Sequence, residues 1–229
     1  MLLNFELIME EEIFFEEEEQ EKKKGPLKFI LAVFLIFLII VMIIPLYGIR
    51  IDPQPERIPS IEEVFVYENN DLMKETITLK TQEDFLHFFD PTDPLVKRTA
   101  NKIVSIACSG EKICHAKAIY YFLRDNFDYI SDPVNFEYVE KPQDMLFSGG
   151  GDCESGTLLM ANLMEAVGID SELVFIPNHA FLRIKLPEAS KRYKQDQLWV
   201  YLDWTCKQCD FGEIPIGNLN QRMNYLGLY

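Results

Sequence analysis

The strongest constraint on this chain of 229 residues is an uncharged, almost entirely apolar run from Phe29 to Ile49. As a helix this run would be about 31 Å long, which matches the thickness of a bilayer core. A buried helix of a soluble domain would have a polar face, and this run has none. Its end, Ile-Pro-Leu-Tyr-Gly-Ile-Arg (44–50), lacks the small-residue cleavage site of a signal peptide. We therefore predict a retained transmembrane helix over residues 27–49.

Basic residues near the ends of the run predict its orientation. Four lysines precede it within residues 22–28, whereas only two arginines follow it closely. Because cytoplasmic flanks carry the excess of Lys and Arg, we expect residues 1–26 to form a cytoplasmic tail and residues 50–229 to lie outside the cytoplasm. The tail is acidic, but glutamates count little in this rule.

Residues 50–229 carry 28 Asp and Glu against 18 Lys and Arg, a net charge of −10. Such a surface repels phosphate backbones, so nucleic-acid binding is disfavoured. Three prolines between Ile51 and Ser60 predict a stiff stalk over residues 50–60. We assign the remainder, residues 61–229, to one folded domain.

Apolar periodicity predicts helices early in this domain and strands late. The first expected helix begins at Pro94 and has the apolar stripe Leu95, Thr99, Ile103 and Ile106. The second covers residues 112–126 with the stripe Ile113, Ala116, Tyr120, Leu123 and Phe127, and the third covers 154–167. The expected strands cover 172–176, 179–186 and 198–205. The segment 129–133 is expected to end in a turn, and residues 64–67 are a candidate for one further strand. The fold class is α+β, with the last of these helices packed on a small antiparallel sheet.

Cys153 lies where a glycine-rich turn, residues 149–151, meets the helix predicted over 154–167. Asp152 is the candidate N-cap, and glycine permits the sharp approach to the helix. The positive end of the helix dipole favours a thiolate at this position. The backbone N–H groups of the first turn could also bind a developing oxyanion.

His179 and Asp203 fall on the next two predicted strands. Alternation places His179 on the same strand face as Phe181, opposite the apolar residues of the strand. If the polar segment 187–197 closes a symmetric hairpin, position 181 lies opposite about 203. His179 and Asp203 then become diagonal neighbours within side-chain reach. A thiol near an imidazole that a carboxylate orients is the arrangement of a thiol nucleophile with its base.

The order Gly-Asp-Cys-Glu, Ala-Val-Gly-Ile-Asp, His-Ala-Phe and Trp-Val-Tyr-Leu-Asp-Trp-Thr resembles the core of the transglutaminase-like superfamily. The resemblance covers roughly residues 100–206, is strongest over 149–205, and is closer to the compact microbial members than to the large animal cross-linking enzymes. It implies a papain-like core in which Cys153 is the nucleophile, His179 the general base and acid, and Asp203 the residue that orients His179.

The chain departs from the usual pattern of this family at two positions. Phe181 stands where the family usually has Trp, and Trp204 stands where it often has Pro. We expect both residues to alter the wall of the substrate pocket and leave the three catalytic side chains unchanged. The resemblance thus predicts the chemistry and leaves the choice of substrate open.

Four further cysteines, Cys108, Cys114, Cys206 and Cys209, remain once Cys153 is set aside. Outside the cytoplasm, an even number of cysteines predicts two disulfides, although three connectivities are possible. The alternative is a zinc site formed by these four thiolates, since Cys206-x-x-Cys209 is a common half-site. A redox-active pair is a third reading, but no thioredoxin-like pattern surrounds it.

We therefore expect a membrane-anchored enzyme without a cofactor that cleaves or transfers at amide bonds of a peptide or protein, with proteins of the cell envelope as candidate substrates. A second reading is a non-catalytic cell-surface binding module that keeps the fold, and a third is a zinc-stabilised domain facing the cytoplasm. Gln143 and Asn178 are candidates for a second oxyanion donor. His87 and His115 lack a supporting motif, so we interpret both as structural residues.

Overall fold

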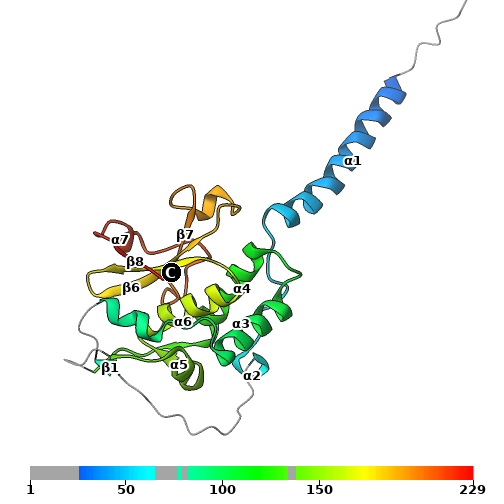
Figure 1. Cartoon of the computed structure of the whole chain (residues 1–229). Helices are drawn as coiled ribbons and strands as arrows, with labels where there is room; N and C mark the ends of the chain where they lie inside the picture. The colour runs from blue at the N-terminus through cyan, green and yellow to red at the C-terminus, as the bar shows by residue number, and fades with distance from the viewer. Residues whose placement is uncertain (1–25, 65–76, 79–81, 134–137, 229) are drawn as a thin grey trace, which may run out of the picture. The chain divides into compact units, whose positions relative to one another are not determined.

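The computed structural model describes residues 26–64, 77–78, 82–133 and 138–228, and it combines helices with small sheets (Figure 1). The chain divides into two compact units, residues 1–45 and 46–229, which we describe separately. The helices are α1 Pro26–Ile51, α2 Ile61–Val64, η1 Gln82–Phe88, α3 Pro94–Ala107, α4 Lys112–Asn126, α5 Pro142–Ser148, α6 Cys153–Ala166, η2 Lys191–Tyr193 and α7 Ile216–Leu219. The strands are β1 Ile77–Thr78, β2 Asp128–Tyr129, β3 Tyr138–Val139, β4 Gly150–Gly151, β5 Ser171–Ile176, β6 His179–Lys185, β7 Trp199–Leu202 and β8 Asn224–Gly227.

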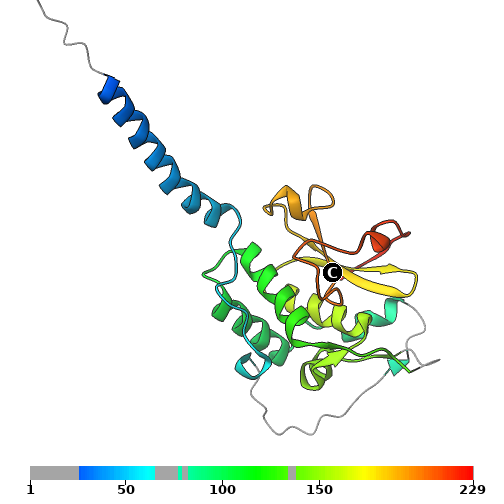
Figure 2. The same ribbon diagram turned by 180° about the vertical axis from the view of Figure 1, so that it is seen from behind.

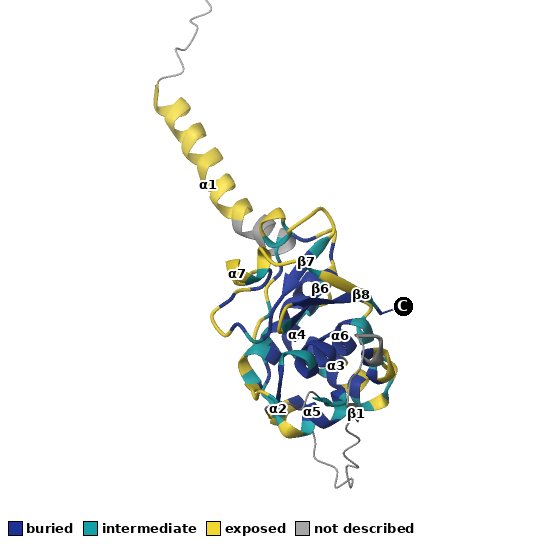
Figure 3. Ribbon diagram, turned by 90° about the vertical axis from the view of Figure 1, so that its left-hand side faces the viewer, coloured by how far each residue is buried: buried dark blue, intermediate teal, exposed yellow. Residues whose placement is uncertain are grey.

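The apolar run forms the helix α1, as predicted. Within the described part of the chain, Pro26–Ile44 is the one helical stretch that is long and apolar enough to span a membrane. Its described side chains are exposed (Figure 3), which a helix buried in a domain core would not allow. The helix itself is confirmed, whereas the membrane anchor, its orientation and the domain boundaries remain predictions.

The larger sheet has the strand order β7-β6-β5-β8, and all its pairs are antiparallel. β6 and β7 form the predicted antiparallel pair, and β5 pairs with β6 in a second hairpin, with Ile176 opposite His179 and Ser171 opposite Ile184. The expected alternation is confirmed, because Leu182 lies in the main core while Phe181 belongs to a smaller cluster on the other face. β8 was not predicted from the sequence.

Helix α6 forms the centre of the domain and packs against β5 and β6. Figures 1 and 2 show α3, α4 and α5 gathered around α6 on the side away from the sheet. The side chains of α6 from Ser155 to Met164 are all buried, including Leu158 and Leu159. Each buried leucine contributes roughly 1.5–3 kcal/mol to folding. This packing fixes the first turn of α6 relative to the strands.

The helices α3 and α4 begin and end close to the predicted positions. All five residues of the stripe predicted for α4 are buried. The stripe predicted for α3 is confirmed at Thr99 and Ile103, which are buried, whereas Leu95 and Ile106 are only half-buried. Additional buried residues of α3 are Val96, Ala100 and Val104. α3 packs against both α4 and α6, so its buried surface is wider than one stripe.

Two local predictions need correction. The strand expected at 64–67 begins with Val64, which instead ends the short helix α2, and residues 65–67 lie outside the described residues. The segment 129–133 was expected to end in a turn, but residues 130–133 form none, and its first residue, Tyr129, belongs to β2, which pairs in parallel with β4. This pairing depends on Gly150, where a Cβ atom would lie 2.7 Å from the carbonyl oxygen of Asp128.

Residues 52–60, which we expected to be a stalk, pack against the domain. The backbone N–H of Glu56 donates to the carbonyl of Ala107 at 2.8 Å, and the Asn126 side chain donates to the carbonyl of Pro59 at 3.2 Å. This segment lies along the ends of α3 and α4.

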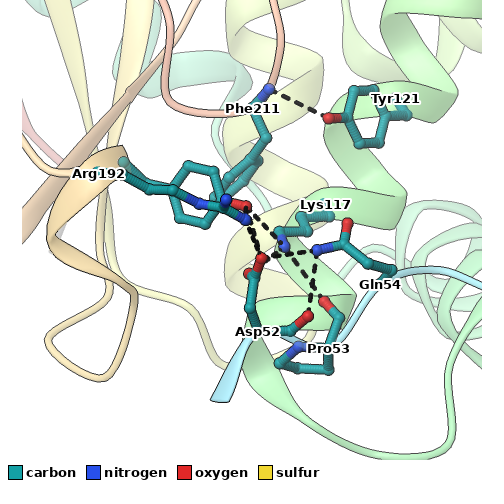
Figure 4. Close-up of polar contacts among 8 residues, drawn as sticks. Asp52, Pro53, Gln54, Lys117, Tyr121, Arg192 and Phe211 are labelled. Atoms are coloured by element: carbon teal, nitrogen blue, oxygen red, sulfur yellow. Dashed lines mark hydrogen bonds and ion pairs between the residues drawn. The ribbon is translucent and has the colours of Figure 1, made fainter. Parts of the chain in front are cut away.

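Asp52 is the centre of a polar cluster that attaches this segment to the domain (Figure 4). Its carboxylate accepts hydrogen bonds from Lys117, Arg192, Gln54 and Tyr193, the last at 2.8 Å. The Lys117 side chain is only 1% exposed and also donates to the carbonyl of Pro53. A buried ammonium needs such a partner, because desolvation of an unpaired charge is very costly.

We predict that Asp52→Ala destabilises the protein by about 3–5 kcal/mol, because it leaves the Lys117 ammonium buried without a carboxylate. Thermal melting of the full-length protein in detergent should then show a midpoint lower by roughly 10 °C. Adding Lys117→Met should recover much of this loss. Asp210→Ala is the matched control, since the side chain of Asp210 is 77% exposed, and it should change stability by less than about 1 kcal/mol. Equal effects of the two aspartate substitutions would contradict the assignment.

Candidate functional site

The glycine-rich segment before Cys153 forms the sharp turn into α6 that the sequence predicted. Gly149 ends α5 with φ 72°, a left-handed conformation that glycine adopts without strain. Gly150 and Gly151 form β4, and Asp152 follows as the N-cap of α6. The Asp152 carboxylate accepts a hydrogen bond from the N–H of Ser155 at 2.7 Å. Cys153 is therefore the first residue of a capped helix.

Cys153 is half-buried and is the free cysteine of the chain. Its backbone N–H belongs to the first turn of α6, where amide groups have no acceptor within the helix. Such a helix start attracts negative charge, so it suits both a thiolate and the oxyanion of an acyl transfer. The position of Cys153 thus has the features that the sequence predicted.

His179 and Asp203 meet across the β6–β7 pair. The last paired residues are Leu182 and Leu202, and the same register places position 181 opposite 203, as predicted. The His179 Nε2 atom lies 2.8 Å from Asp203 Oδ2. His179 also forms a side-chain hydrogen bond with Cys153. The structure therefore brings the three residues together in the order thiol, imidazole, carboxylate.

The Asp203 carboxylate is 1% exposed and is held by further donors. Its Oδ1 atom accepts hydrogen bonds from the Thr205 N–H at 3.1 Å and from the Thr205 hydroxyl at 2.7 Å. Its Oδ2 atom accepts a hydrogen bond from the Asn218 side chain at 3.4 Å, in addition to that from His179. Asn218 lies in the short helix α7, and the sequence contains no signal for its contact with Asp203.

The environment of His179 stabilises its protonated form. Burial opposes the charge, but the hydrogen bonds to Asp203 and Cys153 outweigh it and raise the pKa of His179 to about 10. The imidazole therefore carries its proton at neutral pH. A histidine in this state can stabilise a neighbouring thiolate and donate a proton to a leaving amine.

Trp204 and Phe181 do not form an open pocket wall, which corrects the prediction. Trp204 and Phe181 are both fully buried, with no exposed surface. Phe181 packs with Val174 and Tyr201 in the smaller cluster, and its ring centre lies 6.0 Å from that of His179. Trp204 packs toward α6, because its indole N–H donates to the carbonyl of Cys153 at 3.5 Å. Both large side chains are packed against other residues inside the domain.

The four remaining cysteines form two separate disulfides, Cys108–Cys114 and Cys206–Cys209. The first joins the end of α3 to the start of α4, and the second follows β7. The structure thus does not bring the four thiols of the alternative zinc site together. Within the described ranges, no group of three or more His, Cys, Asp or Glu residues could hold a metal ion.

The other candidates lie apart from these contacts. His87 is exposed in η1, and His115 is half-buried in α4, where burial, opposed by the charge of Glu111, lowers its pKa. Gln143 is half-buried in α5, and Asn178 is exposed in the β5–β6 turn with φ 60°. A role for Gln143 or Asn178 as an oxyanion donor remains a prediction.

Comparisons with known proteins identify one family and two similar structures. Residues 97–204 match the family model described as the transglutaminase-like superfamily. Two solved structures are similar: a candidate cysteine protease from Cytophaga hutchinsonii (19% identity, TM-score 0.38, 56% of this chain and 44% of that chain) and Legionella pneumophila LapG (14%, 0.37, 67% and 77%). This chain therefore spans less than half of the Cytophaga protein. A search of curated proteins found no match.

Proposed function

We propose, from the premise that residues 97–204 of this chain belong to the transglutaminase-like superfamily, that the protein is a membrane-anchored thiol enzyme acting on amide bonds. Family membership and a mixed fold with an antiparallel sheet support a papain-like thiol enzyme in general terms. The observation that carries the finer proposal is the constellation of Cys153, His179 and Asp203, with 2.8 Å between His179 Nε2 and Asp203 Oδ2.

In the proposed reaction the Cys153 thiolate attacks the carbonyl carbon of an amide, and a C–S bond forms while the carbonyl oxygen becomes an oxyanion. The N–H groups at the start of α6, beginning with that of Cys153, are placed to stabilise this oxyanion. When the tetrahedral intermediate collapses, the C–N bond breaks and the protonated His179 gives its proton to the leaving amine. A thioester on Cys153 remains.

Water or a second amine then attacks the thioester, and neutral His179 takes a proton from the attacking group. The C–S bond breaks, which releases an acid or a new amide and restores the thiolate and the imidazolium. Throughout the cycle Asp203 holds the Nε2 side of His179, so that the Nδ1 side faces Cys153. The same three residues would serve hydrolysis by water and transfer to an amine, and we propose a peptide or protein substrate for both reactions.

The membrane anchor is the second part of the proposal. It is supported by the length, composition and exposure of Pro26–Ile44. The lysines before this helix favour a cytoplasmic N-terminus and a domain outside the cytoplasm. Two disulfides fit that location, because disulfides persist in oxidising compartments.

The proposed function predicts that Cys153 reacts with iodoacetamide at pH 6.5 at least tenfold faster than free cysteine, whose thiol pKa is about 8.5. The imidazolium of His179 and the helix start both favour the thiolate. Intact mass under non-reducing conditions should show a single label per chain, since the other four cysteines are paired.

His179→Ala is the matched control for this measurement, because it removes the imidazolium and leaves the helix start unchanged. Its low-pH rate should fall toward that of free cysteine. A wild-type Cys153 that reacts no faster than free cysteine would contradict the enzyme assignment and favour a binding module that keeps the fold.

A further inference from the structure

Trp204 connects the Cys153 side of the candidate site with the His179–Asp203 pair. It follows Asp203 directly in the chain, and its indole N–H contacts the carbonyl of Cys153 at 3.5 Å. The ladder between β6 and β7 ends at the pair Leu182 and Leu202. Asp203 and Trp204 therefore lie beyond the last ladder pair, so contacts other than those of the β6–β7 pair must hold their backbone.

Gly156 makes room for the indole on helix α6. A Cβ atom at Gly156 would lie 2.1–2.4 Å from three ring atoms of Trp204, where real contacts stay above 3.0 Å. Glycine is among the least favourable residues inside a helix, so its presence in the first turns of α6 calls for a packing reason. The close approach of Trp204 supplies that reason. The indole therefore lies directly against the backbone of the helix that carries Cys153.

Two further groups lie close to the indole. The Lys207 Nζ atom lies 5.5 Å from the centre of the Trp204 ring and donates hydrogen bonds to the carbonyls of Arg124 and Phe127 at the end of α4. The ring of Tyr129, in β2, lies 6.4 Å from that of Trp204. Trp204 is thus fixed among α6, β2 and the end of α4.

We propose that Trp204 is a positioning residue that sets the distance between the Cys153 thiol and the His179–Asp203 pair. This inference rests on the proposed function. Trp204 is fully buried, so it acts through its neighbours and does not contact substrate. Because Trp204 directly follows Asp203, a change in the position of Trp204 also displaces Asp203 and the His179 imidazole that Asp203 holds. Displacements of about 1 Å in such a constellation lower rates by roughly 10²-fold.

Gly156→Ala tests this role, because its methyl group would occupy the space of the indole and displace it. In the full-length protein, we expect the rate of Cys153 alkylation at pH 6.5 to fall at least tenfold, with the rate above pH 9 little changed. Such a change in pH profile reports the thiolate–imidazolium pair, which packing alone would not alter. Gly217→Ala is the matched control, since a Cβ atom there has no neighbour within 4 Å.

Trp204→Phe is a second variant, which keeps an aromatic ring and removes the N–H that contacts Cys153. It should lower the alkylation rate at pH 6.5 less than Gly156→Ala does, and adding Trp204→Leu to Gly156→Ala should restore cooperative melting without restoring the rate. A folded Gly156→Ala or Trp204→Phe protein with the wild-type pH profile would overturn the positioning role. A wild-type Cys153 without low-pH reactivity would overturn the proposed function itself and this role with it.

Discussion

Cys153→Ala should abolish the turnover of every amide substrate that the wild-type protein processes, by a factor of about 10⁴ or more. The methyl group of alanine cannot form the thioester, and the structure places no other cysteine thiol at the start of α6, because the remaining four cysteines are paired. Turnover by the purified full-length protein, with release of amine measured over time, checks this expectation.

His179→Ala should be nearly as severe, since one side chain both stabilises the thiolate and protonates the leaving amine. Asp203→Asn should be milder, because it removes the carboxylate that orients His179 but keeps a side chain of the same shape. Combining the three substitutions should lower turnover no further than Cys153→Ala alone, because residues that act as a unit are not additive. All three variants should melt cooperatively.

A His179→Ala protein that keeps wild-type activity would place the base elsewhere, and His87 or His115 would then have to be reconsidered. His87→Ala is the matched control, because His87 is exposed and lies on η1, outside the three-residue constellation. It should leave turnover unchanged. Loss of activity in both histidine variants without loss of folding would contradict the assignment of His179 as the single base.

The sequence predicted the central part of the fold because its signals there are local and agree with one another. The turn at Gly149–Gly151, the cap at Asp152 and the stripe of the following helix all indicate one helix start. Alternation in the strands sets which face His179 occupies, and the length of the hairpin sets its register with Asp203. The sequence alone therefore predicted that the three candidate residues lie close together.

Contacts between distant segments could not be predicted in this way. Lys117 lies in the middle of a helix pattern that gives no reason to expect its burial, and its partner Asp52, far away in sequence, explains why it is buried. Asn218 approaches Asp203 from the four-residue helix α7, which is too short to show a periodic pattern in the sequence. Gly156 did carry a signal, since a glycine inside a helix often marks a close approach, but the sequence could not name Trp204 as the partner.

The pH dependence of the reaction should have an alkaline limb near pH 10, where His179 loses its proton. Burial opposes the charge on His179, and the hydrogen bonds to Asp203 and Cys153 raise its pKa from the ordinary 6.5 to about 10. A raised histidine pKa contributes stability that is fully present below pH about 6.5 and is lost as the pH rises through about 10. Both kcat/KM and thermal stability should therefore decline as the pH approaches 10.

Asp203→Asn tests whether Asp203 raises the pKa of His179, because it removes the carboxylate while Cys153 remains. The pKa of His179 should fall, and the alkaline limb of kcat/KM should move to lower pH. Cys153→Ala should lower the same pKa by removing the thiolate, and this can be followed by NMR titration of the three histidines with isotope-labelled protein. Asp210→Asn, an exposed carboxylate paired with Arg124, should leave the titration of His179 unchanged. If His179 titrates near pH 6.5 in the wild-type protein, the thiolate–imidazolium pair does not exist at neutral pH, and His179 would have to activate a neutral thiol as a general base.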